Sequence, residues 1–407
     1  MESIQKLYKI GFGPSSSHTM GPLRAAQEFS ARHPDATRLR VSLYGSLAAT
    51  GKGHMTDQAL KRGSLPLPIE IIWNPETVLP MHPNGMIFES FDAHGRVTDT
   101  WEVYSIGGGF LKSPSESQDT ITPSIYPLDQ MDAILEWCTQ RGKTLWEYVL
   151  ADEGEEILLH LTAVWNVMKA AVERGLETKG VLPGGLGLRR KALSYYQRAK
   201  GLRVGLQGRG CLFAYALAVA EENAASTGEI VTAPTCGAAG VLPAVLYYCY
   251  KHQELSEKRI LYALATAGLI GILVKENGSI SGAEVGCQGE IGVACAMAAG
   301  AATQLFGGSP AQIEYAAEIG LEHHLGLTCD PVNGLVQIPC VERNAFATAR
   351  AVDANLYANL SDGVHRISFD KVVKTMLATG RDIPSLYRET STGGLAKIYS
   401  CNASNQE

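Results

Sequence analysis

Alternating apolar and polar positions dominate the first third of the chain. Short runs of this kind predict β-strands at 39–44, 69–73, 86–91 and 97–105. The last two runs flank Asp92-Ala-His-Gly95, a turn composition, so they are expected to form a hairpin. A helical pattern also runs to about Arg32. Together these elements predict an α+β domain over residues 1–126.

Helical periodicity replaces the alternation in the rest of the chain. Apolar positions recur at helical spacing in segments 128–140, 155–174, 211–226, 241–251, 257–273, 289–305, 310–322 and 341–357. Almost no alternating β-branched run separates them, so residues 127–407 are predicted to form a larger, all-α domain. A stretch rich in Ser, Pro and Thr, roughly 113–127, is the expected linker.

The composition and charge of the chain argue against some classes of binding partner. The net charge is −6 and no basic run offsets it, which argues against a nucleic-acid surface. The first residues lack the apolar core of a signal peptide, and no stretch of about 18 apolar residues is free of charge. We therefore expect a cytoplasmic protein with no membrane or nucleic-acid partner. Nine cysteines in such a chain favour thiol or metal chemistry over a disulfide framework.

Three cysteines lie in a glycine-rich stretch between Lys275 and Arg343. They are Cys287, Cys329 and Cys340, separated by 42 and 11 residues. Neither the close pair of a zinc site nor the tight run of a ferredoxin is present. Three thiolates from separate loops suit a cluster that leaves one metal position open for substrate. The alternative is that they are buried, inert thiols, and spacing alone leaves both readings open.

A second motif, Gly13-Pro-Ser-Ser-Ser-His-Thr-Met-Gly-Pro22, stands before the first helical pattern. Free N–H groups at a helix start, together with hydroxyls, can hold a carboxylate. Ser15, Ser16, Ser17 and Thr19 are therefore the candidate substrate-binding residues. A serine-rich helix cap without a ligand is the alternative, but a cap uses only one hydroxyl, so the binding interpretation is favoured.

With these motifs in view, the chain resembles the iron-sulfur L-serine dehydratases, the L-serine ammonia-lyases of the bacterial single-chain type. Further segments that carry the resemblance are 182–186, 233–243 and 275–284. The resemblance implies a 4Fe-4S cluster held by Cys287, Cys329 and Cys340. It implies conversion of L-serine to pyruvate and ammonia without pyridoxal phosphate. Family members often end at a cysteine that folds back onto the cluster, which makes Cys401 a candidate fourth ligand.

Removal of the Cα proton of serine requires a base, and two histidines compete for that role. His18 lies inside the serine motif, and His54 lies in Gly51-Lys-Gly-His-Met-Thr-Asp57. Both are surrounded by glycines and hydroxyls, so both are candidate catalytic residues. His323 and His324, near a predicted helix end, are expected to be structural.

Two other functions remain open from the sequence. If the cysteines carry no iron, the chain could be a small-molecule-binding or structural protein on the same scaffold. A related cysteine desulfidase is the other alternative, and the Ser-Ser-Ser-His motif weakens it. The predicted assembly is a homo-oligomer, with a dimer as the first expectation.

Overall fold

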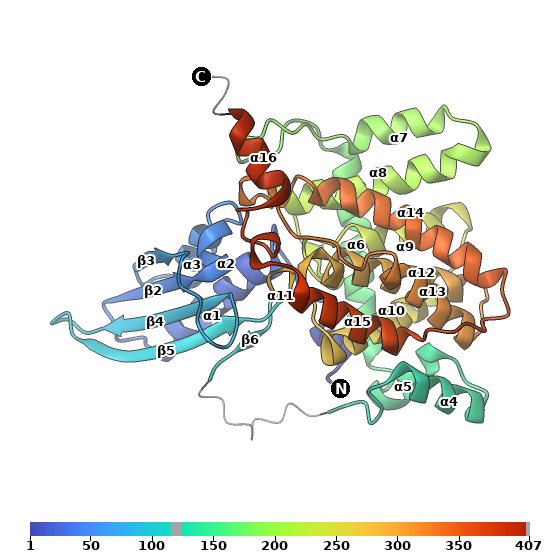
Figure 1. Ribbon diagram of the computed structural model, residues 1–407, viewed down its shortest axis with the longest axis horizontal. Coiled ribbons are helices and arrows are strands. Elements are labelled where there is room, and N and C mark those ends of the chain that lie inside the picture. Colours follow the sequence, from blue (N-terminus) through green and yellow to red (C-terminus); the bar gives the residue numbers. More distant parts are fainter. Residues whose placement is uncertain (115–123, 404–407) are drawn as a thin grey trace.

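The computed structural model describes residues 1–114 and 124–403. A region of strands and short helices lies on one side of the molecule, and a larger region of packed helices forms the other (Figure 1). The predicted fold class, an α+β region followed by a larger helical one, is confirmed. Residues 115–123 of the predicted linker lie outside the described residues.

The main sheet has the strand order β3-β2-β4-β5-β6. Its strands are β2 (Arg38–Tyr44), β3 (Ile69–Asn74), β4 (Gly85–Phe91), β5 (Val97–Ser105) and β6 (Leu111–Lys112). β2 pairs parallel with β3, whereas the β2–β4, β4–β5 and β5–β6 pairs are antiparallel. The four predicted strands and the β4–β5 hairpin are confirmed, because strict alternation fixes which face of each strand is buried.

Helices α1 (Gly21–Arg32), α2 (Gly45–Thr50) and α3 (Thr56–Gly63) complete this region. A small core forms where Phe29 of α1 meets the sheet, with Phe88 and Trp101 at ring-centroid distances of 5.4 and 6.1 Å. The exposed face of β2 carries Arg38 and Arg40, which are paired with Glu70 of β3. The sheet thus has one apolar and one charged face, as an antiparallel-rich sheet with one wet face requires.

The helical region contains the remaining helices. They are α4 (Met131–Arg141), α5 (Leu145–Glu153), α6 (Ile157–Glu177), α7 (Ala192–Lys200), α8 (Val204–Ala225), α9 (Val241–His252), α10 (Glu257–Asn277), α11 (Gly282–Val285), α12 (Ile291–Leu305), α13 (Pro310–Glu322), α14 (Cys340–Asn359), α15 (Phe369–Asp382) and α16 (Gly394–Ala403). The eight predicted helical segments all lie on helices. α8 begins at residue 204 rather than 211, because its first turns are rich in glycine and polar residues and so hide the apolar period. α5, α7, α11, α15 and α16 were not predicted.

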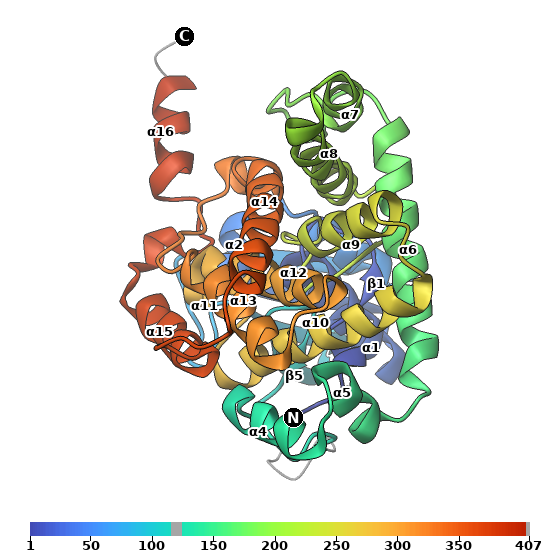
Figure 2. The ribbon, with the colours of Figure 1, turned by 90° about the vertical axis from the view of Figure 1, so that its right-hand side faces the viewer.

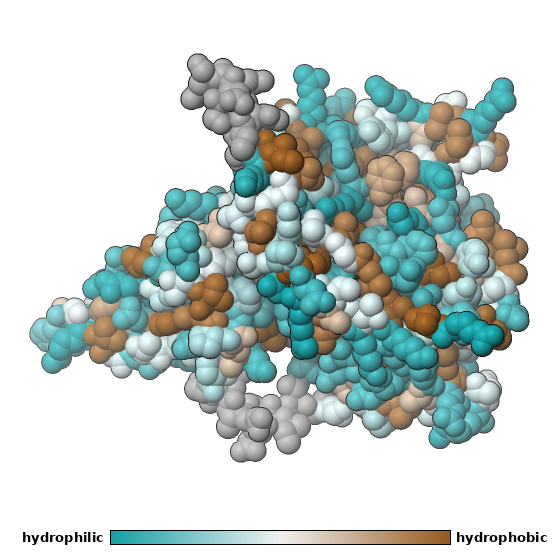
Figure 3. Space-filling model, in the orientation of Figure 1, coloured by the Kyte–Doolittle hydropathy of each residue, from teal (hydrophilic) through white to brown (hydrophobic). Residues whose placement is uncertain are grey.

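α10 and α12 form the centre of the helical region (Figure 2). α12 is buried on nearly every side, which explains its Ala-rich and Gly-rich sequence. α10 is long and apolar enough to span a membrane, but 72% of its apolar stretch is buried inside the fold. On the face shown in Figure 3, hydrophobic residues are interspersed among hydrophilic ones rather than gathered in a band. α10 is therefore a core helix of the helical region.

The N-terminal segment packs into the helical core before the chain enters the sheet region. Ile4, Leu7 and Tyr8 are buried there, and the Tyr8 hydroxyl donates to the Leu264 carbonyl at 2.8 Å. Strand β1 (Ile10–Gly11) then pairs antiparallel with β7 (Ile230–Val231), a contact that sequence reasoning missed. The two regions are thus tied together directly before the serine motif. The domain boundary at residue 126 stays a prediction.

Close packing of α6 against α8 generates the first prediction. A Cβ atom at Gly175 of α6 would lie 2.3 Å from the Ala218 carbonyl oxygen of α8, a backbone atom that cannot rotate away. We expect Gly175→Ala to lower the free energy of unfolding by about 1–3 kcal/mol through overpacking. The matched control is Gly205→Ala, where the added Cβ meets nothing within 4 Å. Thermal unfolding of the two variants compares them, and equal melting temperatures would contradict the packing argument.

Candidate active site

The serine motif forms one π-helical turn, η2 (Ser16–Met20), that leads into α1. Ser15 caps this turn, since its hydroxyl accepts the His18 amide N–H at 3.1 Å. The Ser17 hydroxyl lies 2.8 Å from His18 Nδ1. Within the described part of the chain, the Ser16 hydroxyl makes no hydrogen bond, although the residue is buried. Only one of the three serines therefore acts as a helix cap.

The start of the motif is anchored on the end of α8. The Asn223 side-chain amide donates to the Pro14 carbonyl at 2.8 Å, and the Ser226 hydroxyl donates to the Gly13 carbonyl at 2.9 Å. A Cβ atom at Gly13 would lie 1.9 Å from Asn223 Oδ1, so glycine is required for this close approach. The helical region thus positions the motif even though the motif precedes the sheet in sequence.

His54 lies in the tight connection between α2 and α3, beside the serine motif. The Thr19 hydroxyl donates to the His54 carbonyl at 2.7 Å, and the Thr56 hydroxyl donates to the His18 carbonyl at 2.5 Å. These reciprocal bonds bring the two imidazole rings to a centroid distance of 4.5 Å. Both predicted histidines therefore belong to one buried site.

The hydrogen bonds fix the tautomer of His18. Ser46 Oγ donates to the Glu389 carbonyl at 2.6 Å, so it can only accept from His18 Nε2, 3.2 Å away. His18 Nε2 then carries the proton, and Nδ1 accepts from Ser17. Burial lowers the pKa of His18 well below its usual value, and the adjacent His54 adds to the effect. His18 is a neutral ring with both nitrogens engaged.

His54 has the opposite arrangement. Its Nδ1 lies 3.0 Å from the Thr50 carbonyl, which can only accept, so Nδ1 carries the proton. Nε2 is therefore unprotonated, and His54 lines the same cavity as the cysteines. Burial lowers the pKa of His54 to about 4. A neutral imidazole with an open nitrogen is the form that accepts a proton.

Glu389 is a site residue that the sequence did not single out. It lies on the chain segment between α15 and α16, at φ +56°. Its amide N–H donates to the Cys329 carbonyl at 2.7 Å, and the Cys329 amide donates to the Tyr387 carbonyl at 2.8 Å. Its Oε1 lies 3.5 Å from His18 Nδ1 and 3.9 Å from His54 Nε2. Burial raises the pKa of Glu389 well above its usual value, and the nearby Glu290 and Cys287 add to the shift.

One small enclosed cavity joins these groups to the three cysteines. It is lined by Pro14, Ser15, His54, Gly237, Cys287, Glu290, Cys329, Pro331, Val336, Cys340 and Glu389. Its volume is about 20 Å³, room for about one water-sized molecule. The lining side chains must therefore separate to admit anything larger. The cavity lies where the two regions meet.

The three thiols come from three separate segments. Cys287 lies in the 3₁₀ turn η3 (Gly286–Gly289), Cys329 lies in the loop after α13, and Cys340 is the first residue of α14. Among the described residues, Cys287, Cys329 and Glu290 have ligand atoms within 4.8 Å of one another. Cys340 is not in that group but lines the same cavity. A donor set of convergent thiols in a buried cavity fits a metal cluster.

Glycine and arginine complete the surroundings of the thiols. A Cβ atom at Gly282 would lie 2.7 Å from Glu290 Oε2 and 3.3 Å from Cys329 Sγ, so glycine keeps this wall open. Arg343 of α14 donates to the Thr328 carbonyl at 2.7 Å, and its Nη2 lies 3.8 Å from Asp330 Oδ1. Arg343 thus supports both residues that flank Cys329.

The groups around the cavity have pKa values that shift in opposite directions. Hydrogen bonding from Cys329, together with the Arg343 guanidinium, lowers the pKa of Cys287 to about 6 against the effect of burial. Burial raises the pKa of Glu290 to about 8. Burial likewise raises the pKa of Cys340 above its usual range. Arg343 is therefore the cation that favours a thiolate at Cys287.

Other candidates lie away from the cavity or outside the described side chains. Cys236 is buried beside Met20, with a sulfur–sulfur distance of 3.7 Å, and does not line the cavity. Cys401 lies in α16, but its side chain is outside the part of the chain that the structure describes. His323 and His324 each bond a carbonyl four residues earlier at the end of α13, as expected of structural histidines.

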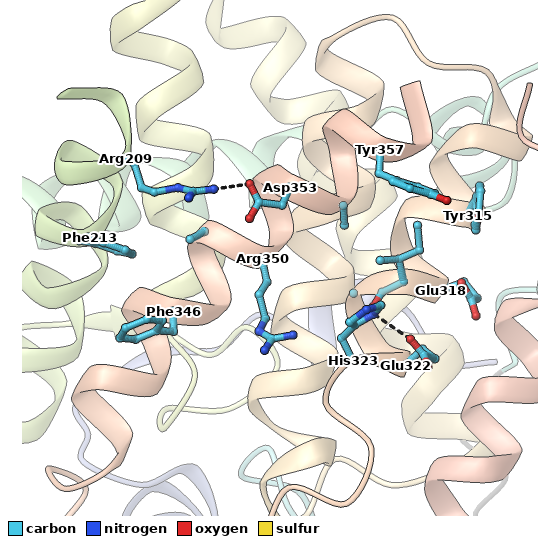
Figure 4. A pocket seen from close by; sticks show the side chains of 14 residues that line it. Arg209, Phe213, Tyr315, Glu318, Glu322, His323, Phe346, Arg350, Asp353 and Tyr357 are labelled. Carbon is cyan, nitrogen blue, oxygen red and sulfur yellow. Dashed lines mark hydrogen bonds and ion pairs between the residues drawn. The ribbon is translucent and has the colours of Figure 1, made fainter. Parts of the chain in front are cut away.

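A larger cavity of about 700 Å³ opens at the surface between α8, α13 and α14 (Figure 4). Arg350, Phe346 and His323 line it, and an ion pair joins Arg209 to Asp353 across its rim. It contains neither a cysteine nor a histidine of the serine motif. Size alone does not make it the active site, because the chemistry-bearing side chains lie in the smaller cavity.

Comparison with protein families agrees with this geometry. The family model described as serine dehydratase alpha chain matches residues 89–396. The model described as serine dehydratase beta chain matches residues 3–70 and 61–116. The chain belongs to the serine dehydratase family. Both parts of a serine dehydratase are thus present on this one polypeptide, and the resemblance drawn from the motifs is confirmed.

Several members of the family are similar over nearly their full length. An L-serine dehydratase of Streptomyces coelicolor is 43% identical, with 97% of this chain and 98% of that protein covered. An L-serine dehydratase of Haemophilus influenzae is 40% identical, with 99% and 100% covered, and one of Helicobacter pylori is 37% identical, with 98% and 99% covered. The Streptomyces alignment runs over 448 positions, more than the 407 residues here, so this chain lacks segments that the relative has.

The second prediction follows from the difference between Ser15, which caps the turn, and Ser16, which does not. Ser15→Ala should lower the free energy of unfolding by about 0.5–2 kcal/mol, because the capping bond to the His18 amide is lost. Ser16→Ala should change it by less than about 0.5 kcal/mol, because no hydrogen bond within the described chain is lost. Chemical denaturation measures both. A larger loss for Ser16→Ala than for Ser15→Ala would contradict the assignment of the cap.

Proposed function

We propose that this protein is an iron-sulfur L-serine dehydratase, which converts L-serine to pyruvate and ammonia. The observation that carries the proposal is the single cavity lined by Cys287, Cys329, Cys340 and His54 beside the serine motif. The printed names of the relatives, L-serine dehydratases in each case, support the same substrate. No observation favours a desulfidase or a non-catalytic protein, because the base and the hydroxyl-rich turn would then have no role.

Cys287, Cys329 and Cys340 are proposed to hold a 4Fe-4S cluster. The fit rests on three free thiols at one cavity, on the open wall at Gly282 and on the Arg343 cation. When bound, such a cluster supplies a Lewis acid that assists departure of the substrate hydroxyl. Cys401 stays a candidate fourth ligand. Cytoplasmic location and a homo-oligomeric assembly also remain part of the proposal.

The serine motif is proposed to bind the substrate carboxylate. Ser15 lines the cavity, and Ser17 and Thr19 lie within two and four residues of it on the same turn. Hydroxyls and amide N–H groups can bind a carboxylate without a formal positive charge. The Ser16 hydroxyl is the one that has no competing hydrogen bond within the described chain. These residues would hold serine so that its Cα faces His54.

His54 is proposed to remove the Cα proton through Nε2. The proton on Nδ1 is held by the Thr50 carbonyl, so Nε2 is the nitrogen that can accept. His18 has both nitrogens engaged by serine hydroxyls, so we assign it a positioning role beside His54. The elimination then needs proton acceptance on one side of serine and departure of hydroxide on the other, the side of the thiols.

The third prediction concerns the thiols. Cys287→Ala, Cys329→Ala and Cys340→Ala should each abolish iron binding and dehydratase activity, because three thiolates are the minimum set for the proposed cluster. Cys249→Ala, which removes a buried thiol of α9 outside the cavity, should keep both. Iron assay and visible absorbance of anaerobically purified protein measure the effect. A cavity variant with full iron and full turnover would remove that residue from the ligand set.

The fourth prediction separates the two histidines. His54→Gln should lower kcat by about 100-fold or more with iron content unchanged, and it should suppress exchange of the serine Cα proton with deuterated solvent. His18→Gln should lower thermal stability, because two buried hydrogen bonds are lost, while exchange remains measurable. His323→Gln, at the distant α13 end, is the control. If His54→Gln kept normal exchange, the base would have to be another group.

A further inference from the structure

We propose that Glu389 binds the α-ammonium group of the substrate. The inference deepens the proposed function and rests on it, since it assigns one more group of an amino-acid substrate. Serine presents a carboxylate, an ammonium and a hydroxyl, and the residues discussed so far account for the first and the last. An acceptor for the ammonium is still required.

The position of Glu389 meets that requirement. The side chain lines the same cavity as the three thiols, and its Oε1 lies within 4 Å of a ring nitrogen of each histidine. Its residue is only 5% exposed, and its Oε2 has no hydrogen-bond partner of good geometry within the described chain, although the Ala283 amide N–H lies close enough to act on the carboxyl group. A buried carboxyl oxygen without a partner costs free energy unless a ligand satisfies it. A buried acceptor without a good partner, among the other polar groups of the cavity, therefore indicates a missing donor.

An ammonium group is the donor that fits best. Its N–H groups form charge-assisted hydrogen bonds with a carboxylate, which are about twice as strong as neutral ones. In a site without bulk water, an unpaired ammonium would be strongly disfavoured. The other donors available from serine are the hydroxyl, which must face the thiols to leave, and the Cα–H bond, which must face His54. The ammonium is the group left to face Glu389.

Glu290 is the other carboxyl group of the cavity and is less suited. Its oxygen lies in the compact group with Cys287 and Cys329, 3.9 Å from Cys329 Sγ. Glu290 therefore lies beside the thiols, where the substrate hydroxyl is proposed to leave. Glu389 instead contacts the histidine side through Oε1 and leaves Oε2 without a good partner within the described chain. The two carboxyl groups therefore have different neighbours and different expected partners.

A second role for Glu389, orienting the imidazole rings, would leave a different signature. A group that only positions His18 and His54 should affect every ligand of the cavity alike and lower kcat. A group that binds the ammonium should discriminate between ligands that have an amine and those that lack it, because a site built to hydrogen-bond an N–H rejects the analogue without it. The distinction can be measured with matched ligands.

The experiment compares L-serine with 3-hydroxypropanoate, which is serine without its amino group. In iron-loaded Glu389→Gln, we expect the KM for L-serine to rise about 10- to 100-fold, the loss typical of a hydrogen bond to a charged group. The inhibition constant of 3-hydroxypropanoate should stay within about twofold. Glu389→Asp, which keeps the charge, should recover part of the affinity for L-serine. Glu314→Gln, a change at a buried carboxyl group of α13 away from the cavity, is the control.

A second arm does not depend on elimination. L-alanine and propanoate differ by the same amino group and have no hydroxyl to lose, so calorimetric titration of the iron-loaded protein measures their binding alone. Glu389→Gln should weaken L-alanine about 10-fold and leave propanoate unchanged. Equal losses for both members of a pair, or no loss for either, would overturn the inference. Absence of pyruvate formation by the wild-type protein would overturn the proposed function instead, and the titration would still decide the role of Glu389.

Discussion

The contact between the Glu389 segment and the two histidines is the interaction on which the rest of the site depends. Ser46 contacts His18 and the Glu389 backbone at once, and Cys329 exchanges backbone hydrogen bonds with the same segment. Because every one of these groups is buried, each bond replaces water that cannot enter, and the loss of one partner leaves the others unsatisfied. The network therefore fixes the histidines, one cavity thiol and the carboxyl group relative to one another.

Close backbone approach makes this network possible. A Cβ atom at Gly53, next to His54, would lie 2.5 Å from the Gly334 carbonyl oxygen, just beyond the loop of Cys329. Gly13 meets the end of α8 at a similarly short distance. At Gly53 the two regions thus meet backbone to backbone, and at Gly13 the backbone meets the Asn223 side chain. Glycine in these loops costs conformational entropy on folding, but it lets two segments approach closely. Close approach fixes the distance between those segments, which a site assembled from separate segments requires.

Sequence reasoning found the parts of the site that carry a local pattern. Alternation gave the strands of the sheet, and helical spacing gave the long core helices. Cys287, Cys329, Cys340 and the serine motif stood out because thiols and hydroxyls were concentrated among glycines. α7 was missed because nine residues are too few for an apolar period to stand out, and β1 and β7 were missed because two-residue strands have no period.

Glu389, Ser46 and Arg343 were missed for a different reason. Each is a common residue type whose role comes from neighbours far away in the sequence. The only local signals were weak: Glu389 precedes the hydroxyl-rich and glycine-rich stretch Thr390 to Gly394, and Arg343 follows Cys340 by one turn of a helix. The tautomers that distinguish His54 from His18 depend on hydrogen-bond partners, which no spacing reveals.

The order of the segments along the chain has a consequence for how the protein is made. Glu389 follows all three cavity thiols in sequence, so during synthesis these cysteines emerge before the segment that closes over them. Domains fold progressively as the chain is made, and the backbone bonds between Cys329 and the Glu389 segment can form only at the end of that process. The thiols are therefore accessible first and enclosed last, so the site stays open until the end of synthesis.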